Sequence, residues 1–453
     1  MPFDTSRGVS RPSARRAAHI IAWLLGFAPG VGAIAQDAAA AARAPVLLGT
    51  VLDAVEHANP RLDVARANAR AARARVPGVT RPPDPQIQFG LMNYDLATFR
   101  PMDVIGMRQL QLMQMMPVAG KLRLAGLVET ARADASATRV ADVSFDLRAR
   151  AAMVFYDLYS TDGTLGVARD TRRLLQDISI VAGKMYQVGD GRQADVLRAN
   201  VELARMQEDI IRMETMRTTM AARLNALRLE PSDAPVGAPR LPVFPAEVPP
   251  LDSLTRVAEQ NRPMIRAGIQ DVEAASGAAR LAQKEIWPDL QLGLQYGRQN
   301  GSMGPQNMAS LMVGASLPIF ANSRQYQMRE ETNAMHAMAT ADLAAMRAET
   351  RGAVAESQAS LVRARRLGEL YRTSVLPQAE ATVTSSLASY RVGTVNFMTL
   401  LDAQMTLNRY RQELFTLDAD EGKAWAELEM LTGRVLVDAH TAQPARPAGG
   451  PPK

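Results

Sequence analysis

The sequence predicts a mainly α-helical fold with a small β part, arranged as two duplicated halves. The first observation is that three landmarks recur in the same order, with each second copy 201 to 205 residues after the first. The pairs are Tyr186–Gly191 with 390–395, Pro83–Gly90 with 288–295, and Met116–Lys121 with 317–322. A nearly constant offset over three landmarks indicates an internal duplication. Each half is predicted to run short helix, two short strands, very long helix, turn and long helix.

The second observation is an alternation of apolar and polar residues with a period of two. In the first half, Ile87, Phe89 and Leu91 alternate with glutamine and glycine, and the second half repeats the pattern. This period is typical of β-strands with one apolar face, and segments of about ten residues with it are the signature of membrane β-barrels. Strands are therefore predicted near residues 84–92, 107–116, 289–297 and 308–317.

The third observation is that long stretches favour helix and hold almost no proline. A short helix is predicted at residues 48–77, ended by Pro77 and Gly78. Roughly 67 residues follow the second strand as one helix, which gives about 100 Å at 1.5 Å per residue. Such lengths are typical of coiled-coil assemblies and rare in globular domains. The long helices are predicted at residues 121–187, 193–229, 322–391 and 396–431.

Composition sets the boundaries of the two repeats. The N-terminus has an arginine-containing segment, a short apolar core and a small-x-small cleavage pattern, which are typical of a secretory signal. Seven prolines between residues 231 and 250 indicate a linker. The predicted order is a signal peptide at 1–35, a first repeat at 36–230, the linker at 231–250, a second repeat at 251–435 and a disordered tail at 436–453.

Charge and residue content exclude several function classes. The formal charge of +6 falls to +3 without residues 1–35, which hold four Arg and one Asp, and no nucleic-acid-binding motif is present. The chain has no cysteine, so neither disulfides nor a lipid-acceptor residue is expected. The four histidines are scattered, so no zinc cluster is predicted. No catalytic set or phosphate loop appears, so neither an enzyme nor a cofactor is predicted.

The chain is predicted to cross a membrane as a β-barrel shared between copies. After the signal, no apolar run reaches the roughly 18 residues that a spanning helix needs. Apart from helices, only closed β-barrels satisfy the hydrogen-bonding groups of the backbone inside a lipid bilayer. Four strands cannot form a closed barrel by themselves, because about eight strands are the smallest number that encloses a filled interior. Two copies would supply eight strands with little lumen and three would supply twelve, and the physical argument slightly favours three.

The residues at the landmarks resemble those of a known family. They are Pro117–Lys121 (Pro-Val-Ala-Gly-Lys), Tyr390–Thr394 (Tyr-Arg-Val-Gly-Thr) and Leu400–Gln404 (Leu-Leu-Asp-Ala-Gln). With the duplication, they resemble the TolC-like outer membrane efflux proteins over residues 46–435. The resemblance implies an outer membrane homotrimer in which four strands per chain form one twelve-stranded β-barrel, continued by a long α-helical periplasmic barrel. It also implies docking to a periplasmic adaptor (a membrane fusion protein) and an inner-membrane pump of the RND type.

The same resemblance implies a role for the two turns between the long helices. The family's turns lie at the periplasmic tip, where the adaptor is expected to contact Gly189, Gly191, Gly393 and Thr394. Glycine also suits a tight helix reversal, because it adopts positive φ or allows close backbone approach. Turn formation alone is therefore the alternative interpretation of these residues.

Three further residues fall on the family's aperture positions. Asp195 matches a gating Asp, Tyr390 a gating Tyr, and Asp402 one position of an acidic ring. The chain departs from the family pattern at Val395, where the best-known members carry a gating Arg, and at Thr399, where the second ring acid would stand. The ring is therefore expected to hold one carboxylate per chain, and such a ring attracts cations. A solvated helix aspartate is the alternative for Asp402.

The substrate is the least specific part of the prediction. Pro-x-x-Gly-Lys resembles the heavy-metal branch of the family, and nine of the 24 methionines lie in or beside the predicted strands. The alternation places Met113, Met115 and Met312 toward the lumen. Thioether is a soft ligand suited to Cu(I) or Ag(I), although methionine is equally interpreted as flexible apolar filler. Copper or silver efflux is the resulting hypothesis. The alternatives are drug efflux or type I secretion through the same duct, or a periplasmic coiled-coil adaptor or scaffold.

Overall fold

The computed structural model describes residues 44–95, 97–102, 106–301 and 304–444. The chain divides into two compact units, Met1–Ala44 and Pro45–Lys453, and only the second is described below. The predicted signal peptide lies outside the described residues, as does the part of the predicted tail that follows residue 444.

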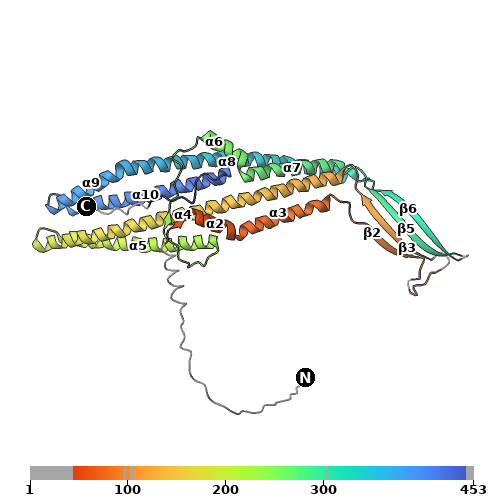
Figure 1. Ribbon diagram of the computed structural model, residues 1–453, viewed down its shortest axis with the longest axis horizontal. Helices are drawn as coiled ribbons and strands as arrows, with labels where there is room; N and C mark the ends of the chain where they lie inside the picture. The colour runs from red at the N-terminus through yellow and green to blue at the C-terminus, as the bar shows by residue number, and fades with distance from the viewer. Residues whose placement is uncertain (1–43, 96, 103–105, 302–303, 445–453) are drawn as a thin grey trace, which may run out of the picture. The chain divides into compact units, whose positions relative to one another are not determined.

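Most of the described chain is α-helical, as the sequence predicted (Figure 1). The helices are α2 (Leu48–Ala58), α3 (Pro60–Val79), α4 (Lys121–Val188), α5 (Gln193–Arg228), α6 (Leu251–Asn261), α7 (Pro263–Lys284), α8 (Gln325–Leu370), α9 (Leu376–Arg391) and α10 (Phe397–Thr432). α4 packs along α3, α5, α7 and α10, while α8 packs against α6, α7 and α10. α4 spans 68 residues, so its two ends lie about 100 Å apart at 1.5 Å per residue.

The short helix predicted at residues 48–77 differs from the structure at two places. α2 ends before Asn59, whose ψ of 120° is extended, because a following proline disfavours the helical conformation. The Asn59 side chain accepts a hydrogen bond from the Arg61 amide at 3.0 Å and so caps α3. α3 continues through Pro77 to Val79, since a proline in the last turn removes only one helical hydrogen bond.

The long helix predicted at residues 322–391 contains a π-helical turn at Tyr371–Val375, between α8 and α9. There the Leu376 amide donates to the carbonyl of residue 371, five residues back. Pro377 follows and has no amide hydrogen to donate. A single π-turn accommodates the missing bond, so the chain continues as α9 where a proline would otherwise end the helix.

The long strands form one antiparallel sheet in the order β2–β3–β5–β6. They are β2 (Gln86–Met92), β3 (Met107–Met116), β5 (Leu290–Gly301) and β6 (Gly304–Ala315). β5 and β6 extend farther toward their connection than the predicted ranges of 289–297 and 308–317. β2 and β6 are the edges of this sheet, and each pairs with one neighbour within the described chain.

The proline-rich segment predicted as a linker at residues 231–250 is packed against the helices. Within it, β4 (Pro239–Arg240) pairs in parallel with β1 (Val46–Leu47). Val236 and Leu241 are buried in one cluster with side chains of α2, α4, α5 and α10. The segment that joins the two repeats therefore also pairs with Val46–Leu47, at the start of the described chain.

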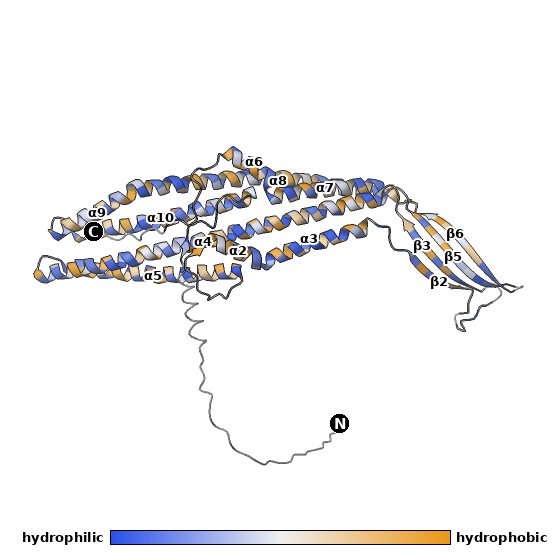
Figure 2. Cartoon of the chain, viewed as in Figure 1, coloured by the Kyte–Doolittle hydropathy of each residue, from blue (hydrophilic) through white to orange (hydrophobic). Residues whose placement is uncertain are grey.

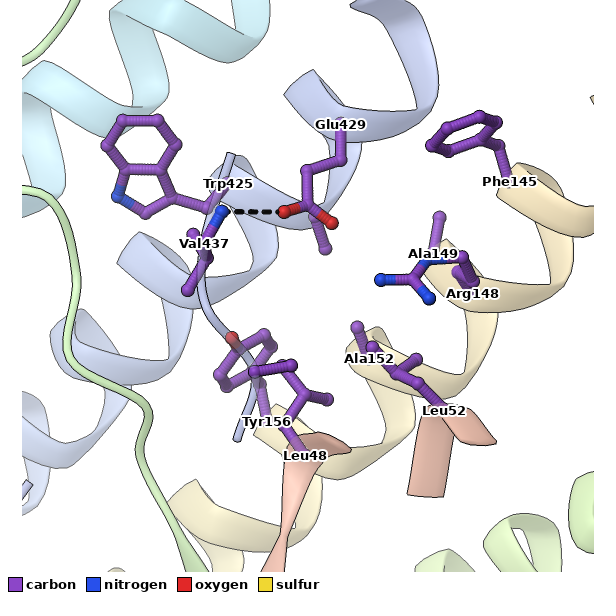
Figure 3. Close-up of a pocket in the computed structure, with 12 residues that line it drawn as sticks. Leu48, Leu52, Phe145, Arg148, Ala149, Ala152, Tyr156, Trp425, Glu429 and Val437 are labelled. Atoms are coloured by element: carbon purple, nitrogen blue, oxygen red, sulfur yellow. Dashed lines mark hydrogen bonds between the residues drawn. The ribbon is translucent and has the colours of Figure 1, made fainter. Parts of the chain in front are cut away.

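Residues 436–444 correct the prediction of a disordered tail at 436–453. The Glu429 carboxylate accepts the amide hydrogens of Leu436 and Val437 at 2.8 Å each. Figure 3 shows the bond to Val437 in a pocket walled by α2, α4 and α10. Burial raises the pKa of Glu429, while the two amides act to lower it. A buried carboxylate thus holds a segment whose composition indicates disorder.

Candidate functional site

The α4–α5 turn reverses the chain through Gly189, whose φ is +88°. The amides of Asp190 and Gly191 both donate to the Met185 carbonyl at 2.9 Å and close the end of α4. A Cβ on Gly191 would lie 2.8 Å from the Tyr186 amide nitrogen, so a side chain there would displace the backbone. The turn itself therefore requires both glycines, one for its positive φ and one for close approach.

The α9–α10 turn uses one glycine. Gly393 has a φ of +75°, and nothing lies within 4 Å of the position that its Cβ would occupy. The Thr394 amide and hydroxyl both donate to the Ser389 carbonyl at 3.0 Å. The Asn396 side chain then accepts from the Thr399 amide at 2.9 Å and caps α10. The turn is well closed internally, yet it exposes bare backbone at Gly393.

The structure brings two of the predicted gate residues close together. Tyr390, at the end of α9, is 5% exposed and packs edge-on against Phe397, with ring centroids 5.8 Å apart. Burial raises the pKa of Tyr390, and the nearby Asp195 carboxylate on the first turn of α5 raises it further. The phenol is therefore neutral at physiological pH and can act as a hydrogen-bond donor.

Asp402 does not join this pair. Its side chain is exposed on α10, whereas the preceding Leu400 and Leu401 are buried in the cluster that contains Tyr390. An acidic ring at this position would therefore need Asp402 from several copies of the chain. In each copy this side chain would point away from the buried cluster that contains Leu400 and Leu401.

If the chain forms the channel that the resemblance implies, replacing Asp402 with asparagine is expected to reduce its cation selectivity in planar lipid bilayers. A carboxylate that faces a conducting path attracts cations, and the amide removes the charge at nearly constant size. Asp402→Glu is the matched control, since it keeps the charge and should retain selectivity. Unchanged selectivity and unchanged block by divalent cations in Asp402→Asn would remove this residue from the aperture.

The strand register gives the sheet two chemically different faces. Residues directly opposite each other on paired strands share a face. One row of each face illustrates the difference: Ile87–Leu112–Leu294–Leu311 and Gln86–Met113–Gly293–Met312. The apolar face is highly exposed in the single chain, with 72% of Ile87 and 76% of Leu311 accessible. Figure 2 shows the resulting mixture of hydrophobic and hydrophilic residues along the strands.

The three methionines predicted to face a lumen lie on the same face of the sheet. Met113 and Met115 are two residues apart on β3, and Met312 of β6 shares a row with Met113. The register adds three more to this face: Met92, Met107 and Met308. These three were not among the predicted lumenal residues, although the period of two along each predicted strand could have placed them on this face.

The contacts of Lys121 are not apparent from the sequence, where this residue is only the last position of the family motif Pro117–Lys121. Lys121 is 5% exposed. Its Nζ lies 2.9 Å from both the Asp289 carboxylate and the Trp287 carbonyl oxygen, and 3.3 Å from the Glu285 carboxylate. One buried cation therefore joins the start of α4, in the first half, to the connection between α7 and β5 in the second.

No helix in the described part of the chain is long and apolar enough to cross a membrane. Among the same residues, no group of three or more histidine, aspartate or glutamate side chains is placed to hold a metal ion.

Comparison with known proteins agrees with the architecture. Residues 254–434 match the family described as outer membrane efflux protein. This match confirms the predicted family resemblance for the second repeat. The cobalt-zinc-cadmium resistance protein CzcC of Cupriavidus metallidurans is 26% identical over 262 residues, which cover 56% of this chain and 58% of that protein. The chain therefore matches a little more than half the length of this curated relative.

Solved outer membrane channels share the fold. CusC is 16% identical, and the match covers 86% of this chain and 93% of CusC with a TM-score of 0.74. The outer membrane protein VceC of Vibrio cholerae is 17% identical, with 86% and 96% covered and a TM-score of 0.74. The MtrE channel of Neisseria gonorrhoeae is 15% identical, with 86% and 89% covered and a TM-score of 0.72. At these identities, the likeness shows the TolC-like fold alone.

Proposed function

We propose that this protein is the outer membrane exit duct of a tripartite efflux system, which carries heavy-metal cations from the periplasm and an inner-membrane pump to the exterior. The observation that carries the proposal is a four-stranded sheet with an exposed apolar face and two open edges, β2 and β6. An apolar outer face suits lipid, while the opposite face of Gln, Gly, Met and Ser suits a water-filled lumen. A periplasmic adaptor or scaffold would need the long helices but would have no use for such a sheet.

The open edges require other copies of the chain. In lipid, an unpaired strand edge leaves backbone groups without hydrogen-bond partners, at a cost of several kcal/mol each. Four strands cannot close on themselves, so β2 of one copy pairs with β6 of the next. Three copies give one twelve-stranded barrel, and the long helices of the three copies continue it as a tunnel in the periplasm.

The proposed partners are those that the family resemblance implies, and the position of the helix turns supports them. α4 carries the chain from the sheet to the α4–α5 turn, about 100 Å away, so the turns face a partner on the periplasmic side. A membrane fusion protein contacts the exposed turns at Gly189, Gly191, Gly393 and Thr394, and an RND-type pump loads the duct. We expect export to use the signal peptide predicted at residues 1–35.

The substrate proposal rests on two observations that point to different metals. The name of the relative CzcC refers to cobalt, zinc and cadmium, whereas the sheet's methionines suit Cu(I) or Ag(I). Both support a heavy-metal cargo, and the side chains favour copper or silver. Drug efflux or type I secretion through the same duct is the alternative, because substrate choice is expected to reside in the pump.

Deletion of the gene tests the proposal. The deletion strain is expected to lose tolerance to copper and silver, with cobalt, zinc, cadmium and a drug panel measured alongside. Loss of tolerance to cobalt, zinc and cadmium alone would keep the metal duct and discard the copper or silver assignment. Sensitivity to drugs with unchanged metal tolerance would contradict the heavy-metal cargo altogether. Exclusive recovery of the protein in the soluble periplasmic fraction would contradict the duct.

A further inference from the structure

The methionines of the sheet are segregated to one of its faces. Six of the paired strand residues on that face are methionine: Met92, Met107, Met113, Met115, Met308 and Met312. On the apolar face, the paired residues include one methionine, Met116. A side chain that serves only as flexible apolar filler should be found on the lipid-facing side at least as often as on the polar side. The observed segregation therefore calls for another property of the thioether.

The methionine-bearing face contains no ionisable group among its paired residues. Besides methionine, it carries only glutamine, glycine and serine. Zn²⁺ and Co²⁺ are usually held by imidazole, thiolate or carboxylate, none of which is present on these strands. Thioethers are soft, neutral ligands, and they select soft cations such as Cu(I) and Ag(I). The ligand chemistry of the face thus favours a soft monovalent ion.

One group of thioethers is centred on Gly293. Met113 of β3 and Met312 of β6 flank this residue in one row, and their backbones are about 10 Å apart across two strand spacings. A Cβ on Gly293 would lie 3.2 Å from Met312 Cε and 3.7 Å from Met113 Cγ. Both side chains therefore lean over the glycine from opposite sides, and Met115 lies on the same face two residues along β3.

The surroundings of the Met113 sulfur are polar and partly enclosed, whereas Met115 and Met312 are more exposed in the single chain. Gln111 donates its side-chain amide to Met113 Sδ at 2.9 Å, so this sulfur already acts as an acceptor. Met113 is half-buried in the single chain, whereas the neighbouring Leu112 on the other face is exposed. A partly enclosed sulfur with a glutamine amide beside it, such as that of Met113, is better placed to replace the water shell of a cation than a sulfur packed in an apolar core.

We propose that Met113, Met115 and Met312 form a binding site for a soft monovalent cation, Cu(I) or Ag(I), on the lumenal face of the sheet above Gly293. Further thioether ligands follow along the same face, toward the loops at the far end of the strands, at Met107, Met92 and Met308. The inference rests on the proposed function, which places this face in the lumen. A transported ion would move between weak sites of like chemistry and would not be held at any one of them.

Silver binding to the purified full-length protein in detergent tests the site. Equilibrium dialysis against silver nitrate in chloride-free buffer, with the metal measured by mass spectrometry, gives the affinity. The double variant Met113→Leu/Met312→Leu is expected to bind Ag(I) at least about tenfold more weakly, the lower end of what loss of even an outer-shell partner costs. Leucine for methionine nearly conserves volume, so the variant should fold. Met116→Leu, on the opposite face, is the matched control and should leave binding unchanged.

The outcome separates the site from the proposed function. Equal Ag(I) affinity in the double variant and the parent would overturn the site, as would a parent protein that binds no Ag(I). Single-channel conductance of the same samples is measured in planar bilayers. If the parent conducts ions but its silver binding does not depend on the methionines, only the proposed site is rejected. A parent that fails to conduct ions would contradict the proposed duct.

Discussion

Replacing Lys121 with methionine is expected to lower the thermal stability of the protein sharply and to reduce the yield of assembled channel. The Lys121 side chain is 6% exposed, and its Nζ lies 2.9 Å from the Asp289 carboxylate and 3.3 Å from that of Glu285. Without the lysine, two partly buried carboxylates face each other with no cation between them. Breaking a buried ion pair costs about 3–5 kcal/mol, and the partial exposure of the acids favours the lower end of that range. Thermal unfolding followed by circular dichroism measures the loss.

The effect should extend into the sheet, because Asp289 also holds the β5–β6 hairpin. The Asp289 amide donates to the Ser316 hydroxyl at 3.1 Å, and the Ser316 amide donates to the Asp289 carbonyl at 3.0 Å. Lys184→Ala is the control, since Lys184 is exposed near the other end of α4 and should have little effect. A Lys121→Met protein that unfolds at the parent's temperature would show that the contact does not join the two halves.

Replacing Gly393 with phenylalanine is expected to abolish efflux while leaving the trimer assembled. The space around its Cβ position is open within 4 Å, so the new side chain would not collide with its own chain and would project from the tip. There it would obstruct an adaptor that packs on the bare backbone. Metal tolerance of a complemented deletion strain, with the oligomer assayed in the same membranes, measures both outcomes.

The positive φ of Gly393 adds a separate effect that needs its own control. Any residue other than glycine at φ +75° is strained, by roughly 1–2 kcal/mol. Gly393→Ala introduces the same strain with little bulk, so it should retain most of the efflux. If alanine abolishes efflux as completely as phenylalanine, or if either variant loses the trimer, the glycine is required for folding and the adaptor contact loses its support.

The strand faces were readable from the sequence because their signal is local and periodic. Residues such as Ile87 and Leu294 alternate with polar neighbours, and alternation along a strand assigns faces without knowledge of the partner strand. The turns were readable for a similar reason, since the φ values at Gly189 and Gly393 are ones that glycine adopts without penalty. These features depend on a few consecutive residues.

Features that depend on distant residues could not be predicted. Lys121 and Asp289 are 168 positions apart, and a lysine at the start of a helix does not indicate that it is buried. The tail at residues 436–453 is rich in Ala, Pro and Gly as a whole, but the carboxylate of Glu429 binds the backbone amides of Leu436 and Val437 at its start. The effect of Pro377 also depends on context, because a proline can end a helix or be accommodated by a π-turn.

The proposed barrel requires the open sheet edges of three copies to pair and close one ring. The chain has no cysteine, so an engineered pair reports a single contact. Phe89→Cys on β2 is combined in turn with cysteine at Ala309, Leu311 or Val313 on β6, positions on the apolar face. Within one chain, β3 and β5 separate the two edges by about 14 Å, too far for a disulfide.

Oxidation of these variants in outer membranes, followed by denaturing electrophoresis, is the most direct measurement. For at least one pair, we expect covalent products of two and three chains and none larger, because a closed ring of three leaves no free edge. A series that ends at two chains or extends beyond three would contradict the twelve-stranded barrel. The absence of cross-linked products for all three pairs would contradict the pairing of β2 with β6.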